Sequence, residues 1–283
     1  MTDDQPAGPN IPTSYGEYIP AANEPLHGLV QRMAHMHFLQ PLPPERLAPD
    51  SFIKLSFIME GKLHYFDGQG QAFDQHDGIT GHVPPRRGII ATSDGPVRCM
   101  MVNFFPSAFH RVFGGPADRF NGMMVPPDRL FGDRIGTLYQ EIRATRDPQL
   151  ALDVVQRFLI DLLPAHSTAA ISPIEHLEHH IRERKGTVPV SELAALAGLS
   201  ERQLQRRFKV EIGLSPKAFC QVVRFNHVYG EMKRNGTLDL DLALACGYFD
   251  ESHMMKDLVY FLGKNPKRSL SLIRPMVDRD LGH

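Results

Sequence analysis

The stretch Leu193-Ala194-Ala195-Leu196-Ala197-Gly198-Leu199-Ser200-Glu201-Arg202-Gln203-Leu204-Gln205-Arg206-Arg207-Phe208 decides the fold of the carboxy-terminal part of this chain. A short apolar helical pattern ends at Gly198, and Ser200 is a helix-capping residue in front of a second helical pattern. In that second helix, Leu204 and Phe208 are four residues apart and share one face. A helix, a glycine turn and a capped helix in this order predict a helix-turn-helix.

The same pattern occurs a second time, 49 residues later before the turn and 50 residues later after it. The second copy consists of Leu242-Ala243, Gly247, Asp250, Met254 and Leu258. Between the copies, Ser215-Pro216 opens a long helix that ends at Asn235-Gly236. Its roughly 18 residues span ~27 Å, comparable to the ~34 Å turn of B-DNA. The second helix of each motif is here called a recognition helix. One chain can therefore place two recognition helices into successive major grooves.

The carboxy-terminal region is also the basic part of a chain whose net charge is only -1. Residues 172–274 hold 16 Lys+Arg and 12 Asp+Glu, whereas residues 1–171 hold 14 and 18. Arg202, Gln205, Arg206 and Lys209 lie beside or opposite the Leu204/Phe208 stripe. Arginine pairs bidentately with guanine and glutamine with adenine, and extra cations neutralise phosphates. The alternative is a solvated basic helix face, but two capped turns at matched spacing favour DNA binding.

Over about residues 172–272 the sequence resembles the AraC/XylS-type transcriptional regulators. This resemblance implies an all-α domain with two helix-turn-helix motifs over residues 171–275. It also implies a sequence-specific transcription regulator of the bacterial cytoplasm and nucleoid, with double-stranded DNA as partner and RNA polymerase as a further candidate. The residues that carry the resemblance are Val190-Ser191-Glu192-Leu193-Ala194, Gly198-Leu199-Ser200, Gln203 to Phe208, Gly213-Leu214-Ser215-Pro216, Arg224-Phe225, Gly247 to His253 and Gly263-Lys264-Asn265-Pro266.

By this resemblance, specific residues of the two recognition helices contact DNA. The first helix contributes base contacts from Arg202, Gln205 and Arg206, and the second from Ser252, His253 and Lys256. The predicted DNA-binding set is completed by Gln203, Arg207 and Lys209. The second helix departs from the family pattern at Met254-Met255, Leu258 and Val259, and it carries Asp250, Glu251 and Asp257. We therefore expect the first helix to dominate specificity.

The amino-terminal part is predicted to be a β domain followed by helices. Residues 1–25 contain five prolines and are expected to form a mobile arm. Short apolar runs between Gly, Pro and Asp clusters predict strands over about residues 26–105. Residues 53–59 and 62–66 are expected to pair as a hairpin about Glu60-Gly61. Helices are expected over residues 108–113, 130–144 and 150–163, and the sequence Ser172-Pro173-Ile174-Glu175 opens another helix after a linker at 167–170.

Family members commonly join the DNA-binding module to a cupin-like β-barrel that binds a small effector. The resemblance thus implies an α+β multidomain chain, with a sensor and dimerisation domain over residues 26–170 and a tail at 276–283. Arg86 and Arg87 are candidates to bind an anionic effector, although an Arg pair after Pro84-Pro85 also fits a solvated loop. Apolar residues of the 130–163 helices predict a homodimer, with packing on the barrel as the alternative. These residues are Leu130, Ile135, Leu138, Ile142, Leu152, Val155, Leu159 and Leu163.

Two other functions stay open, a metal-dependent cupin enzyme and a constitutive DNA-binding regulator without an effector. His35-Met36-His37 has the spacing that offers two histidines to one metal from one strand face. No glutamate follows at close spacing, so we expect packed or surface histidines, with neither a metal nor a cofactor. No nucleophile elbow, phosphate loop or HExxH run is present, and we expect no enzyme. Cys99, Cys220 and Cys246 fit a reducing compartment, and no apolar run approaches a membrane span.

Overall fold

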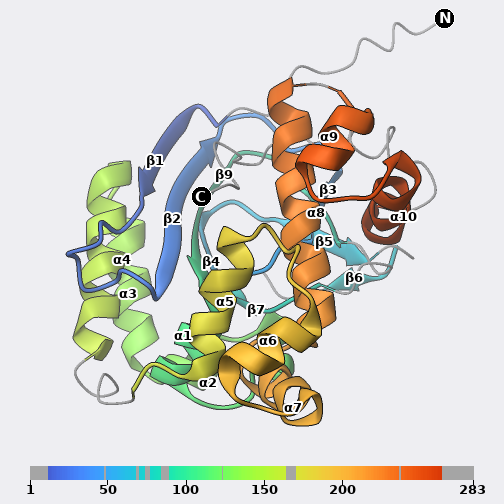
Figure 1. Cartoon of the computed structure of the whole chain (residues 1–283). Helices are drawn as coiled ribbons and strands as arrows, with labels where there is room; N and C mark the ends of the chain where they lie inside the picture. Colours follow the sequence, from blue (N-terminus) through green and yellow to red (C-terminus); the bar gives the residue numbers. More distant parts are fainter. Residues whose placement is uncertain are drawn as a thin grey trace, which may run out of the picture.

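The computed structural model describes residues 12–262, with short gaps at 48, 68–69, 74–76, 84–88, 123, 164–169 and 236. The predicted fold class is confirmed: an amino-terminal β domain with helices precedes an all-α region with two helix-turn-helix motifs. In Figure 1 the helices α3 and α4 lie on one side of the β domain, and the carboxy-terminal helices pack along the other. No helix in the described part of the chain is long and apolar enough to cross a membrane.

The β domain consists of two antiparallel sheets. The six-stranded sheet has the order β1-β2-β9-β4-β7-β10, and the four-stranded sheet has the order β3-β8-β5-β6. Apolar side chains of β2, β4, β5, β8 and β9 fill the space between the sheets, as expected for sheet-on-sheet packing. The strands are β1 Ser14–Tyr18, β2 Val30–Phe38, β3 Glu45–Leu47, β4 Ile53–Glu60, β5 His64–Asp67, β6 Ala72–Phe73, β7 Gly78–Thr80, β8 Ile89–Thr92, β9 Val97–Phe104 and β10 Met124–Val125.

The predicted hairpin between β4 and β5 is wrong. β4 pairs with β7 and β9 in the larger sheet, whereas β5 pairs with β6 and β8 in the smaller one. The chain changes sheets at Gly61, whose φ of +80° is accessible to glycine. A Cβ at Gly61 would lie 2.1 Å from the carbonyl oxygen of Pro96. The Glu60-Gly61 signal therefore marks a corner of the β domain and not a hairpin turn.

The predicted mobile arm over residues 1–25 is wrong for the part that the structure describes. Residues 14–18 form the edge strand β1 and pair antiparallel with β2, from Ser14 opposite His37 to Tyr18 opposite Met33. This segment lies between Pro12 and Pro20 and contains no proline, so every residue in it keeps its backbone donor. Residues 1–11 lie outside the described part.

Helices α3 Arg134–Ala144 and α4 Pro148–Leu162 cover the outer face of the larger sheet. Helices α1 Pro106–Phe113 and α2 Asp128–Phe131, and the 3-10 turn η1 at Ala117–Phe120, contribute to the same hydrophobic core. The apolar residues that predicted a dimer interface are largely covered by the chain itself: Ile135, Leu138, Ile142, Leu152, Val155 and Leu159 are buried. The packing alternative thus accounts for these side chains, because α3 and α4 contact the strands β1, β2 and β4.

The carboxy-terminal region has two small cores joined by one helix. The helices are α5 Pro173–Glu183, α6 Val190–Ala197, α7 Glu201–Glu211, α8 Pro216–Asn235, α9 Leu240–Ala245 and α10 Glu251–Leu262. Helices α6 and α7 pack with α5 and the first half of α8, and α9 and α10 pack with its second half. Both helix-turn-helix predictions are confirmed, including left-handed glycines at Gly198 and Gly247. The predicted linker at 167–170 and the tail at 276–283 fall, except for residue 170, outside the described part.

Candidate DNA-binding interface

Helix α7 is fixed by its cap and by one buried stripe. The Ser200 hydroxyl accepts from the backbone N–H of Gln203, and the Gln203 amide oxygen accepts from the backbone N–H of Ser200 at 2.9 Å. This reciprocal capping box defines where the helix begins. Leu204 and Phe208 are fully buried in the first core. The helix therefore has a single outward face.

Three of the predicted contact residues lie on that outward face. Arg202, Gln205 and Arg206 are exposed, at spacings of three and four residues. Their long donors thus project together from the first two turns of α7. In helix-turn-helix proteins these turns of the second helix contact the base edges.

The other three predicted residues of α7 already have partners within the chain. Gln203 belongs to the capping box, as described above. Arg207 donates from Nε to Glu211 at 2.8 Å, and Glu211 also accepts from the hydroxyl of Ser172. Lys209 lies 3.8 Å from Asp118 of η1. These side chains stabilise α7 and its surroundings and are less free to reach DNA than Arg202, Gln205 and Arg206.

The second recognition helix, α10, follows the same plan with a weaker polar face. Asp250 accepts from the backbone N–H of His253 at 2.7 Å, which caps the helix, and Met254 and Leu258 are buried. Ser252 and Lys256 are exposed. His253 is half-buried and packs edge-on against Tyr248, with ring centroids 5.0 Å apart.

The acids of α10 are less repulsive toward DNA than their number suggests. Asp257 is buried and accepts from Nη2 of Arg224 at 2.8 Å, so its charge is balanced within the chain. The Arg224 guanidinium also lies over the Tyr248 ring, 4.6 Å from its centroid. Burial, and then the nearby Asp257 charge, raise the pKa of Tyr248, which therefore stays protonated. Since Asp250 serves as a cap, Glu251 is the acid left exposed among these three.

Helix α8 sets the separation of the two recognition helices. It has 20 residues, which corresponds to a length of about 30 Å. Phe219 belongs to the first core, whereas Phe225 and Tyr229 belong to the second. In Figure 1 α7 lies at the lower end of α8, whereas α10 lies to one side of α8, below α9. A separation of this order suits two successive major grooves on one face of a duplex.

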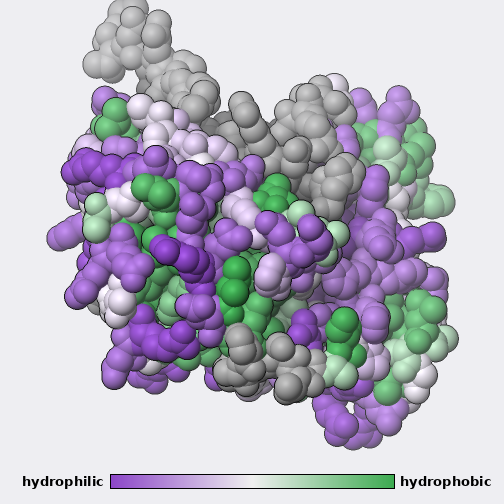
Figure 2. Space-filling model, turned by 90° about the vertical axis from the view of Figure 1, so that its left-hand side faces the viewer, coloured by the Kyte–Doolittle hydropathy of each residue, from purple (hydrophilic) through white to green (hydrophobic). Residues whose placement is uncertain are grey.

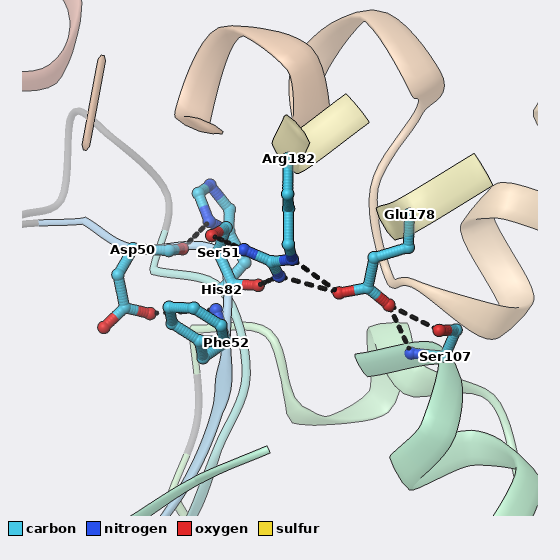
Figure 3. Close-up of polar contacts among 7 residues, drawn as sticks. All are labelled: Asp50, Ser51, Phe52, His82, Ser107, Glu178 and Arg182. Atoms are coloured by element: carbon cyan, nitrogen blue, oxygen red, sulfur yellow. Dashed lines mark hydrogen bonds and ion pairs between the residues drawn. The ribbon is translucent and has the colours of Figure 1, made fainter. Parts of the chain in front are cut away.

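The structure also shows a junction between the β domain and α5 that the sequence did not predict (Figure 3). Glu178 of α5 is fully buried, and its Oε2 accepts from the backbone N–H of Ser107 at 3.0 Å and from the Ser107 hydroxyl. Arg182 donates to Glu178 Oε1 at 2.7 Å and to the carbonyl and hydroxyl oxygens of Ser51. A Glu–Arg pair at i, i+4 usually lies on the exposed face of a helix. The sequence alone therefore gives no sign that this pair joins α5 to the β domain.

Aromatic rings surround the arginine of this junction. The Arg182 guanidinium lies 4.3 Å from the ring centroid of Phe52, 5.2 Å from that of Phe105 and 5.1 Å from that of Phe219. A second ion pair lies nearby, where Arg111 of α1 donates from Nε and Nη2 to the buried Glu175 at 2.9 and 3.1 Å. Residues from both halves of the chain therefore share one desolvated polar cluster.

The amino-terminal candidates are not brought together into a site. His35 is fully buried and His37 is half-buried on the same face of β2, which confirms the shared face. Among the described residues, no group of three or more His, Cys, Asp or Glu side chains could hold a metal ion. Arg86 and Arg87 lie outside the described residues, so the predicted effector contact stays a prediction.

Comparison with known proteins supports the carboxy-terminal assignment. Residues 193–270 match the family profile of a helix-turn-helix domain. The HTH-type transcriptional regulator YbfI of Bacillus subtilis is 26% identical over 123 residues, which are 41% of this chain and 43% of that protein. The HTH-type transcriptional regulator MtrA of Neisseria gonorrhoeae is 36% identical over 67 residues, 24% of this chain and 22% of that protein. The chain thus matches less than half the length of these relatives.

Two solved structures are also similar to this chain. ToxT from Vibrio cholerae O395 is 10% identical with a TM-score of 0.46, covering 86% of this chain and 99% of ToxT. A probable AraC family transcriptional regulator from Rhodopseudomonas palustris CGA009 is 28% identical with a TM-score of 0.30, covering 36% of this chain and 98% of that one. The family match over residues 193–270 and the two helix-turn-helix motifs together identify the carboxy-terminal part of this chain as a helix-turn-helix domain.

Proposed function

We propose that this protein is a sequence-specific DNA-binding transcription regulator that recognises duplex DNA through α7 and α10. The observation that carries the proposal is the exposed set of Arg202, Gln205 and Arg206 on the outward face of α7. These are the donor types that pair with guanine and adenine edges in the major groove. On this proposal α7 reads one half-site, and α10 reads a second one through Ser252, His253 and Lys256.

Duplex binding by the full chain tests this function. Genomic DNA fragments retained by the purified protein are sequenced, and the affinity for the enriched sequence is then measured over a range of salt concentrations. Neutralised phosphates release counterions, so affinity should fall steeply as salt rises. Replacing Arg202 and Arg206 by Ala should abolish enrichment, whereas replacing Arg184, an exposed arginine at the end of α5, should not. Retention of random fragments without an enriched sequence would contradict sequence-specific recognition.

We further propose that the amino-terminal domain, over residues 26–170, responds to a small effector, and that the DNA-binding domain spans residues 171–275. Apolar side chains, among them Met36, Tyr65 and Cys99, fill the space between the two sheets, so an apolar effector there would have to displace them. Arg86 and Arg87 remain the candidates to bind an anionic effector. Mass spectrometry of small molecules that copurify with the full chain tests this. A constitutive regulator would copurify with no small molecule, and its affinity for DNA would not change when small-molecule extracts of cells are added.

A homodimer through the outer face of α3 and α4 forms a further part of the proposal. A groove on this face is lined by residues of both charges around a partly buried apolar floor. Figure 2 faces the side of the molecule on which α3 and α4 lie in Figure 1, and apolar patches lie there among hydrophilic side chains. Such a mixed face can pair with its own copy about a twofold axis. The groove residues are Arg134, Thr137, Leu138, Glu141, Val154, Arg157, Phe158 and Asp161.

The remaining expectations follow from the proposed DNA partner. A regulator of transcription works in the bacterial cytoplasm, at the nucleoid when bound, and RNA polymerase is its further candidate partner. The rival function, a metal-dependent enzyme, requires a metal centre. It predicts stoichiometric transition metal in the purified full chain, which elemental analysis measures directly.

A further inference from the structure

We infer that Asn121 and Glu178 are positioning residues that hold recognition helix α7 on the amino-terminal domain in a geometry fit for DNA. This inference rests on the proposed function and adds a role for residues outside the helix-turn-helix motifs. It depends on two separate contacts, one at the end of α7 and one through α5.

The first contact is made directly at the end of α7. The Asn121 side chain donates from Nδ2 to the carbonyl oxygen of Gly213 at 2.7 Å, and its Oδ1 accepts from the backbone N–H of His82 at 3.0 Å. Gly213 follows α7 with a φ of +91°, and a Cβ there would lie 3.3 Å from the carbonyl carbon of Ala117. One amide group therefore connects the β domain to the backbone that ends the recognition helix.

The second contact reaches α7 through α5. Helix α1 has no side-chain cap of its own, because Phe105 occupies its N-cap position. Glu178 supplies the missing acceptor from α5 by binding the N–H and hydroxyl of Ser107 in the first turn of α1. A carboxylate is favoured at this end of a helix by the unpaired N–H groups and the helix dipole. Figure 3 shows how the same carboxylate also binds Arg182, which reaches Ser51 on the β domain.

Helix α5 is in turn attached firmly to α7. Ile174, Leu177 and Ile181 of α5 share the first core with Leu204 and Phe208 of α7. The Ser172 hydroxyl, which caps α5, also donates to Glu211 in the last turn of α7. A displacement of α5 from the β domain would therefore move α7 with it.

The junction leaves the recognition face of α7 open. Its contacts are made at Lys209 and Gly213, at the carboxy-terminal end of the helix, whereas Arg202, Gln205 and Arg206 remain exposed. An inhibitory contact would cover these donors. The arrangement instead restricts how α7 can tilt and slide while its base-reading side chains stay accessible, and such preorganisation lowers the entropic cost of binding.

Two full-length variants test the inference, each with a matched control. Asn121→Ala is compared with Asn103→Ala, a buried asparagine of β9 whose side chain bonds to Gln31 of β2 and not to a carboxy-terminal helix. Glu178→Gln is compared with Glu17→Gln, which weakens the ion pair of Glu17 with Arg32 on the β domain. Each protein selects its site from randomised duplexes, and amide hydrogen exchange is measured over residues 201–214 without DNA.

The expected result is a loss of sequence information confined to the α7 half-site. We expect the two junction variants to bind the selected site about tenfold more weakly, with the α10 half-site unchanged. We also expect faster exchange at the end of α7, and controls that behave as the unaltered protein. A variant that is merely less stable would have a smaller active fraction, and it would lose binding equally at both half-sites. That outcome, unchanged exchange over α7, or tighter DNA binding by the junction variants would overturn the inference.

The exchange measurement keeps this test separate from the proposed function. If the unaltered protein selects no DNA sequence, the proposed function fails, whereas altered exchange over α7 would still show that the junction positions this helix. If the unaltered protein selects a site and the variants select it equally well, the positioning role alone fails.

Discussion

His35 lies opposite Gly16 in the β1–β2 ladder, and helix α4 closes over both of them. A Cβ at Gly16 would lie 2.8 Å from Cβ of Pro148 and 3.2 Å from Cδ1 of Leu152, so glycine permits this close approach. The His35 ring beneath is fully buried, and neither ring nitrogen has a hydrogen-bond partner among the described residues. The edge of the β domain thus contains an imidazole that is enclosed away from water.

This enclosure predicts sensitivity to acid. Burial, and then the charges of Arg98 and His37, lower the pKa of His35 from 6.5 to about 4, against a smaller opposite effect of Asp147. The unfolded chain therefore binds more protons between these pH values, and the free energy of unfolding should fall as pH drops from 6.5 to 4. The shift corresponds to a loss of about 3 kcal/mol. Denaturant unfolding of the full chain at pH 7 and pH 4.5 measures this.

A histidine variant identifies the responsible group. His35→Leu should make stability less dependent on pH over this window, because it removes the titrating ring. His27→Gln, which alters an exposed histidine, should keep the full dependence. An unchanged pH profile in the His35 variant would show that other groups cause the acid sensitivity.

The neighbouring arginines of α7 should differ in effect. Arg206 is exposed, so Arg206→Ala should cost about 1 to 3 kcal/mol of DNA binding and relax base preference at one position. Arg207 bonds to Glu211, so Arg207→Ala should mainly lower stability, by about 1 kcal/mol, because a largely buried carboxylate loses a partner. Binding selection and denaturant unfolding on both variants separate the two effects. Equal losses of base preference would show that Arg207 leaves Glu211 to contact DNA.

The two recognition helices should contribute unequally to specificity. His253→Ala should cost less sequence information than Arg206→Ala, because the His253 ring is half-buried against Tyr248 and α10 presents fewer long donors. Selection on randomised sites with both variants checks this expectation. A larger loss from the His253 change would assign the main base contacts to α10.

The α3–α4 face should control the oligomeric state. Arg134 and Arg157 line the groove together with Glu141 and Asp161, so replacing both arginines by Glu should convert a dimer into a monomer. Sedimentation at micromolar concentration measures the change, with Arg184→Glu on α5 as the control. Adding Glu141→Arg and Asp161→Arg to the double variant should restore association. An unaltered protein that sediments as a monomer would contradict the proposed interface.

The carboxy-terminal motifs were predictable because local signals and core packing agree there. Gly198 and Gly247 adopt left-handed conformations, Ser200 and Asp250 cap their helices, and the apolar pairs at i, i+4 are buried. Each of these features depends on residues close in sequence, which a pattern can show.

The β domain and the junction depend on contacts between distant residues. The turn signal at Glu60-Gly61 was correct, but the following strand β5 pairs with β6 and with β8, the latter some 25 residues farther along, and not with β4. Glu178 and Arg182 form an ordinary helix pair in sequence, and their role arises from Ser51 and Ser107, which lie 131 and 71 residues away. Short-range patterns carry no information about such partners.

Helix α8 fixes the rotation between the two helix-turn-helix units as well as the distance between them. Since residues of this helix belong to both cores, no loop between the two units can absorb a mismatch. One residue inserted into α8 would rotate the second unit by about 100° and advance it by about 1.5 Å. On the DNA, one added base pair between half-sites would turn the second by about 35°, since a helical turn holds 10–10.5 pairs. On the proposed function, the two half-sites that one chain reads must therefore keep a constant number of base pairs between them.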